Sequence, residues 1–77
     1  MITRQQLQFL RQTYGLSFRE VAEASEGKIS HTAISFIEKG ERVLNQETGA
    51  VILQALYKAN EKQAAKRVEK EREKDEQ

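Results

Sequence analysis

Few side chains in this 77-residue sequence are able to carry out covalent or metal chemistry. The absence of cysteine excludes a thiol nucleophile, a disulfide and a thiolate zinc site. The only histidine, His31, has no Asp near it in sequence, and no glycine-rich phosphate loop or metal-ligand spacing is present. We therefore expect no enzyme, no catalytic residue, no metal, no cofactor and no small-molecule ligand.

Side chains suited to binding are concentrated between residues 31 and 36. His31 can offer a hydrogen-bond donor or acceptor, and Thr32 can form a hydrogen bond or an apolar contact. Ala33 and Phe36 can make only apolar contacts. Because Phe36 comes about one helical turn after the other three, a helix is needed to present them to the same partner.

Capping signals divide residues 1–59 into four expected helices. The expected N-caps are Thr3, Ser17, Ser30 and Asn45, and the helices they open cover 4–14, 18–25, 31–39 and a fourth segment that begins after Asn45. Gln6 and Glu20 complete capping boxes at the first two. Gly15 and Gly40 supply left-handed stops. No strand pattern is visible, so we expect an all-α domain.

The last eighteen residues differ from the rest in composition. Residues 1–59 carry seven Lys/Arg, six Asp/Glu and 26 apolar residues, whereas 60–77 carry six of each charge and only three apolar residues. A core therefore forms only from 1–59. No Gly or Pro ends the fourth helix after Tyr57, so we expect 60–77 to be a charged helical tail, partly disordered past about residue 72.

The helices over 18–25 and 31–39, joined by a turn that contains glycine, are typical of a helix-turn-helix. Residues 5–57 resemble the lambda-repressor/Cro-like (XRE) helix-turn-helix family, most specifically at residues 34–40 (ISFIEKG), where the family ends its recognition helix with Ile-x-x-Ile/Leu-Glu-x-Gly. Val21-Ala22 matches the hydrophobic-Ala step of its preceding helix. The resemblance implies a small four- to five-helix lambda-repressor-like domain, followed here by the charged helical tail, that binds an operator in double-stranded DNA.

The sequence departs from the family pattern at several positions. Phe18 occupies a site where the family often has a Gln that reaches a phosphate. Residues 22–30 are about two residues longer than usual, which means either an enlarged turn or a longer preceding helix. Leu44 replaces a common Pro, and Gly49 replaces a common Leu.

In a helix-turn-helix, the first residues of the second helix face base edges in the major groove. We expect base contacts from His31, Thr32, Ala33 and Phe36, the two apolar residues against a thymine methyl. The alternatives are that His31 is simply an exposed polar residue and that Phe36 is a core residue on a helix turned differently. Expected phosphate contacts are Ser17, Phe18, Arg19, Lys28, Ser30, Ser35, Lys39 and Arg42, and the alternative for the cations is solvated surface charge. Glu38 is expected to have a structural role.

A sequence pI of about 8.0 is modest for a DNA-binding protein, which favours a homodimer that spans two half-sites. The expected dimer interface is Leu53, Leu56 and Tyr57, and the alternative is a solvated helix that contacts only its own core.

We therefore expect a cytoplasmic transcriptional regulator, by resemblance a repressor of the phage, plasmid or mobile-element type. The alternative is an antitoxin-like or antirepressor-like protein-binding adaptor on the same scaffold, favoured by Phe18, Phe36 and the low net charge. A signal peptide is not expected, because the N-terminus (MITRQQLQFLRQ) has no long apolar core and no small-residue cleavage site. A membrane partner is not expected, because no apolar run approaches the roughly 20 residues of a membrane span.

Overall fold

The computed structural model describes residues 2–75, with side chains described as far as Lys66. It has the element order α1 (Arg4–Thr13), α2 (Phe18–Ala24), α3 (His31–Lys39) and α4 (Gln46–Asp75). Over residues 2–75 the chain forms no strand, which confirms the all-α class. None of the helices in this described part combines the length and the apolarity needed to cross a lipid bilayer.

Each expected N-cap is confirmed. Thr3 and Ser17 form complete capping boxes, in which the cap hydroxyl accepts the N–H of Gln6 at 3.2 Å and of Glu20 at 3.1 Å. Ser30 Oγ accepts the N–H of Ala33 at 3.1 Å. Asn45 Oδ1 accepts the N–H of Thr48 at 2.7 Å, which starts α4. Local hydrogen bonding therefore fixes where all four helices begin.

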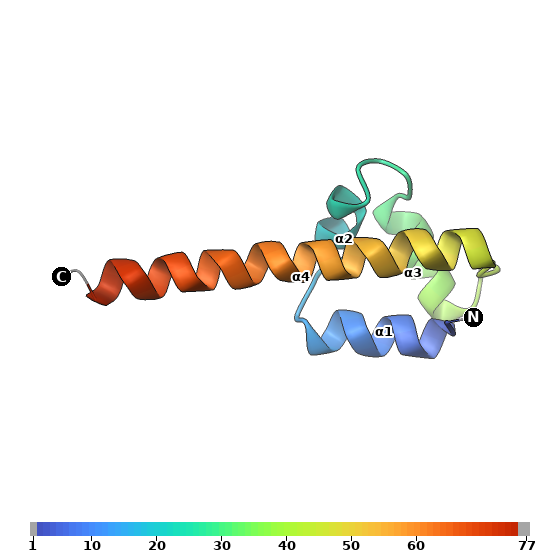
Figure 1. The fold of residues 1–77 in the computed structure, drawn as a ribbon. Helices are drawn as coiled ribbons and strands as arrows, with labels where there is room; N and C mark the ends of the chain where they lie inside the picture. Colours follow the sequence, from blue (N-terminus) through green and yellow to red (C-terminus); the bar gives the residue numbers. More distant parts are fainter. Residues whose placement is uncertain (1, 76–77) are drawn as a thin grey trace.

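The four helices enclose a small core (Figure 1). α2 packs against α3 and α4, and α1 packs against α3 and α4. The core residues that are at most 6% exposed are Leu7, Leu16, Val21, Ala33, Ile34, Ile37, Ile52, Ala55, Leu56 and Ala59. Burying each large apolar side chain contributes about 1.5–3 kcal/mol, so every one matters in a domain of this size.

α4 is much longer than the core that it helps to build. Among the side chains described as far as Lys66, Ala59 is the last buried residue of α4, in agreement with a core confined to 1–59, but the helix continues without a break through Asp75. Its final part extends beyond the other three helices (Figure 1). The tail is helical as far as Asp75, in agreement with the expected helical tail; partial disorder past about residue 72 stays a prediction, and 76–77 lie outside the described residues. No helix-breaking residue interrupts this segment.

Gly49 has a packing reason to lie inside α4. It is buried, and a Cβ added there would lie 3.3 Å from Ile2 Cγ2 and 3.7 Å from Leu44 Cδ1. Because Gly49 has no side chain, Ile2, which precedes α1, and Leu44, which precedes α4, pack against the first turn of α4. This contact offsets part of the roughly 1 kcal/mol that glycine costs in a helix relative to alanine.

Candidate nucleic-acid interface

The turn between α2 and α3 is enlarged. α2 ends at Ala24 and α3 starts at His31, so residues 25–30 form the connection, and the extra length of this segment does not extend α2. Helix-turn-helix turns usually contain three or four residues. Glu26 (φ 59°) and Gly27 (φ 82°) both adopt left-handed backbone conformations here, which reverse the chain direction.

Ser25 holds this turn together from inside. It is 6% exposed, and its hydroxyl donates to the Ala22 carbonyl at 2.6 Å. The same oxygen accepts the backbone N–H of Ile29 at 3.3 Å. One buried hydroxyl thus links the last turn of α2 to the end of the connection, and so restrains where α3 begins.

α3 presents most of the expected base-contact residues to solvent. His31 and Thr32 are exposed, and Phe36 is 41% exposed. The alternative that Phe36 is a core residue is therefore wrong. The opposite side of α3 carries Ile34 and Ile37, which are 2% and 1% exposed, and it packs against the rest of the domain.

Ala33 is a correction to the expected base contacts. Its side chain is only 4% exposed, because it lies on the same side of α3 as Ile34 and Ile37 and packs inward. A residue enclosed in this way cannot reach a base edge. The small side chain instead allows α3 to approach its neighbours closely.

The cations among the expected phosphate contacts lie on α2, in the turn, in the last turn of α3 and directly after α3. Arg19, Lys28, Lys39 and Arg42 are exposed, and none has an acidic partner within 4.0 Å among the described residues. The hydroxyls of Ser17 and Ser30 are occupied as N-caps, which leaves the amides of the first helical turns to bind an anion. Ser35 is half-buried on α3.

Phe18 contacts a cation within the domain. Its ring lies 4.2 Å from the guanidinium carbon of Arg11, and its side chain is half-buried against the core. The expectation that Phe18 contacts a phosphate therefore applies only to its backbone N–H at the start of α2. The side chain covers an internal ion pair instead.

That ion pair joins α1 to α3. Arg11 donates from Nε to Glu38 Oε2 at 2.7 Å and from Nη2 to Glu38 Oε1 at 3.0 Å, and a third donation reaches the Leu16 carbonyl at 3.0 Å. The two side chains are 16% and 7% exposed. The expected structural role of Glu38 is confirmed, and its carboxylate is neutralised within the domain.

The expected dimer interface is only partly at the surface. Leu56 is 1% exposed and belongs to the core, so its assignment to an interface is wrong. Leu53 is half-buried against the same core. Tyr57 is 49% exposed and remains available to a second copy. Leu56 turns inward because it lies one helical turn after Ile52 on the buried side of α4.

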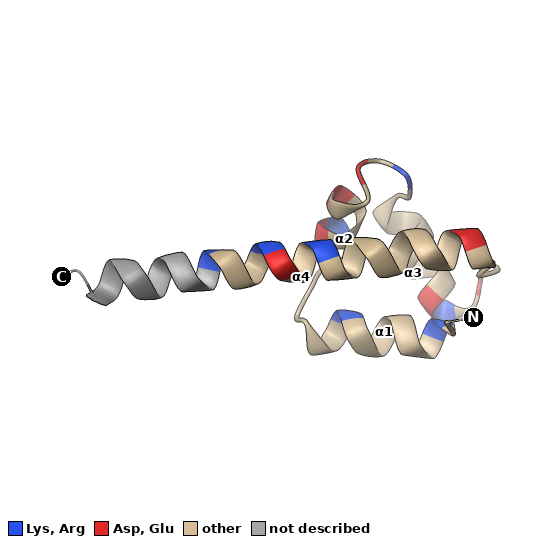
Figure 2. Cartoon of the chain, in the orientation of Figure 1, with Lys and Arg blue, Asp and Glu red and all other residues tan. Residues whose placement is uncertain are grey.

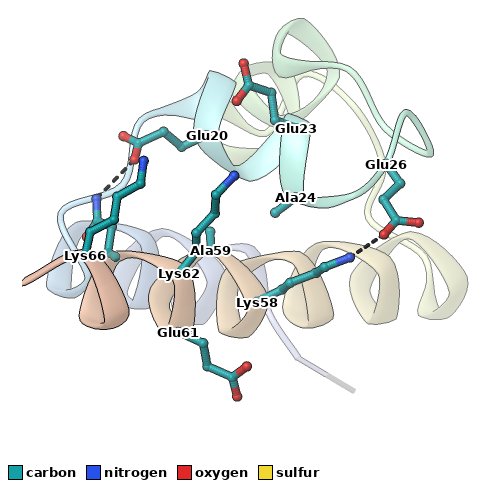
Figure 3. A pocket seen from close by; sticks show the side chains of 10 residues that line it. Glu20, Glu23, Ala24, Glu26, Lys58, Ala59, Glu61, Lys62 and Lys66 are labelled. Atoms are coloured by element: carbon teal, nitrogen blue, oxygen red, sulfur yellow. Dashed lines mark hydrogen bonds and ion pairs between the residues drawn. The ribbon is translucent and has the colours of Figure 1, made fainter. Parts of the chain in front are cut away.

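Sequence analysis missed two opposed rows of charge on α2 and α4. Lys58, Lys62 and Lys66 recur along α4 (Figure 2), and they line one groove together with Glu20, Glu23 and Glu26 (Figure 3). Lys58 forms an ion pair with Glu26, and Gln63 donates to Glu20 at 3.0 Å. The four-residue spacing of these lysines indicates that they share one side of a helix. Only the packing of α4 on α2 shows that this side faces the glutamates.

Both engaged acids on this groove are stabilised in their charged form. The Ser17 backbone N–H, which donates to the Glu20 carboxylate, lowers the pKa of Glu20 below its usual value. The hydrogen bond from Lys58 lowers the pKa of Glu26 in the same direction. Glu20 and Glu26 thus engage residues of α4, whereas the Glu23 carboxylate points away from α4 (Figure 3).

The structural contacts of two arginines, Arg11 and Arg4, were also not predicted from the sequence. Arg11 follows Leu7 by one turn on the inward side of α1, which is the signal that could have marked it as an internal partner. The guanidinium of Arg4 lies against Gly40, where an added Cβ would clash with its Nη1. This places a further cation at the C-terminal end of α3, where the helix dipole favours it.

No model of a known protein family, no curated protein and no solved structure matches this chain. Among the described residues, no group of three or more His, Asp or Glu side chains is arranged to hold a metal ion. The candidate interface is therefore assigned from its own geometry and charge.

Proposed function

We propose that this protein is a sequence-specific DNA-binding transcriptional regulator that inserts α3 into the major groove. The observation that carries the proposal is the exposure of His31, Thr32 and Phe36 on a helix with an N-cap at Ser30, together with exposed cations that have no acidic partner within 4.0 Å among the described residues. In helix-turn-helix proteins the corresponding surface of the second helix reads bases. The resemblance to the lambda-repressor/Cro-like family supports the same reading.

The distribution of charge supports the proposal more strongly than the net charge of +1 does. Glu38 is neutralised by Arg11, Glu26 by Lys58, and Glu20 is hydrogen-bonded within its cap and to Gln63. The surrounding arginines and lysines keep their charge available for phosphates. Two exposed acids, Glu23 and Glu41, have no cation within 4.0 Å among the described residues, so the four unpaired cations exceed the unpaired exposed acids of α2, α3 and the residues directly after α3 by two.

The proposed regulator acts as a homodimer on an inverted repeat. Four candidate phosphate-contacting cations per copy give modest affinity at physiological salt, and a second copy converts the second half-site contact into an intramolecular one. Tyr57 on α4 is the exposed aromatic that we assign to this contact. Repression by blocking a promoter is the simplest mechanism for such a protein.

A protein-binding adaptor is the second candidate function, and one observation favours it. Phe9 is 67% exposed on α1, where it borders a shallow apolar depression with Ile2 and Leu10. An exposed apolar patch of this kind is typical of a protein contact. It lies on α1, so binding there does not require α3.

Selection of bound sites from a random duplex pool at two salt concentrations distinguishes the two functions. A regulator enriches an inverted repeat and loses affinity steeply as salt rises. Lys39→Ala should weaken binding to all sites equally and reduce the slope of log affinity against log salt concentration by about one, because one phosphate contact is lost. Phe36→Ala should instead reduce the preference for particular bases in the selected sites. A folded protein that enriches no motif and shows no salt-dependent retention would overturn the DNA-binding proposal in favour of the adaptor.

A further inference from the structure

The exposed side of α3 carries one large apolar side chain, Phe36, at a position expected to contact bases. Thr32 and Phe36 lie one turn apart on it, and Phe36 keeps 41% of its surface exposed. Burial of a large aromatic side chain is favourable, so covering Phe36 with an apolar group of a partner would stabilise a complex formed on this side of α3.

The same surface lacks the side chains that usually read purines. Guanine is read by Arg or Lys, and adenine by Asn or Gln, through paired hydrogen bonds. Residues 31–37 contain none of these four types. Lys39, the first basic residue of α3, lies in its last turn, away from the end that leads into the groove.

Only one apolar feature distinguishes bases in the major groove, the C5-methyl group of a pyrimidine. Thymine carries it, and 5-methylcytosine presents the same group on a G·C pair. A helix that offers an aromatic ring and a threonine methyl, but no bidentate donor, is matched to this feature.

We propose that α3 discriminates its half-site chiefly by 5-methylpyrimidines, with Phe36 as the main contact and the Thr32 methyl as the second. This inference rests on the proposed function, since it requires α3 to lie in the major groove. It adds a chemical basis for specificity: the protein reads methyl groups, and its operator contains thymines at the positions that α3 contacts.

The test uses the full chain and the selected duplex, in which single thymines are replaced by deoxyuridine. This substitution removes only the C5-methyl group. We expect each contacted position to lose about fourfold in affinity, the equivalent of one buried methyl group. Conversely, 5-methylcytosine at the same position should bind about fourfold more tightly than cytosine.

Two variants connect the effect to its residue. Phe36→Ala should bind thymine and deoxyuridine duplexes equally at the position that Phe36 contacts. Phe9→Ala, which removes an exposed phenylalanine from α1, should keep the full difference. Circular dichroism spectra that match the parent protein would establish that both variants are folded.

The possible outcomes separate this inference from the function on which it rests. Binding to a selected duplex that is indifferent to every deoxyuridine substitution would overturn the inference and leave the regulator standing. A methyl effect that persists in Phe36→Ala would overturn the assignment to Phe36. Failure to bind any duplex would overturn both the proposed function and the inference.

Discussion

Arg11 on α1 and Glu38 on α3 form an ion pair with two hydrogen bonds, whose N–O distances are 2.7 and 3.0 Å. This ion pair joins α1 directly to α3. Phe18 at the start of α2 covers the guanidinium. The half-buried Arg11 of α1 thus contacts one residue of α2 and one of α3, and it helps to orient the helix that we propose to enter DNA.

We expect Arg11→Ala to lower the free energy of unfolding by about 3 kcal/mol, because it leaves the Glu38 carboxylate buried without a partner. Urea denaturation measures the change. Arg19→Ala removes an exposed arginine and should cost no more than about 0.5 kcal/mol. Equal effects of the two substitutions would show that the ion pair does not stabilise the domain.

We expect Ser25→Ala to destabilise the protein by about 1–3 kcal/mol. The substitution leaves the half-buried N–H of Ile29 without its side-chain acceptor and removes the link to the Ala22 carbonyl. Ser35→Ala, at a half-buried position where no such hydrogen bond forms among the described residues, is the control. Hydrogen exchange at Ile29 should be faster in Ser25→Ala, and unchanged protection there would contradict the role assigned to Ser25.

Stability should fall as acid protonates Glu20 and Glu26. Both carboxyl groups have a folded-state pKa below the usual glutamate value, which is about 4.3 in unfolded chains. Their contribution to the free energy of unfolding is therefore present in full above about pH 4.3 and is lost as the pH falls through the lower folded-state pKa. Urea midpoints between pH 7 and 3 measure it. Glu20→Gln keeps the capping geometry but does not titrate, so its midpoints should depend less on pH, and a curve parallel to that of the parent protein would refute this origin.

Leu56→Ala and Tyr57→Ala should separate the core from the surface of α4. Leu56→Ala leaves a cavity and should cost about 2–5 kcal/mol of stability. Tyr57→Ala should change stability little, while weakening binding to an inverted repeat far more than binding to a single half-site. Sedimentation measures the accompanying shift from dimer to monomer. If Tyr57→Ala leaves the dimer intact, the contact between copies lies elsewhere.

The positions of the helices were predictable because the signals that set them are local. A cap hydroxyl accepts an amide three residues later, and Gly40 ends α3 in a left-handed conformation at φ 81°, so neither depends on distant residues. The same locality explains why α4 continues past its core, since nothing in its sequence stops it.

Packing alone decided which side of each helix is buried. Ala33 was assigned to base contact because it lies in the first turn of the expected recognition helix, and Leu56 to a dimer interface as an apolar residue of the fourth helix, yet both turn into the core. Adjacent positions on a helix differ by about 100°, so a small rotation exchanges core and surface. Arg11 and Glu38, separated by 27 positions, meet only because α1 packs against α3, and no local pattern carries that information.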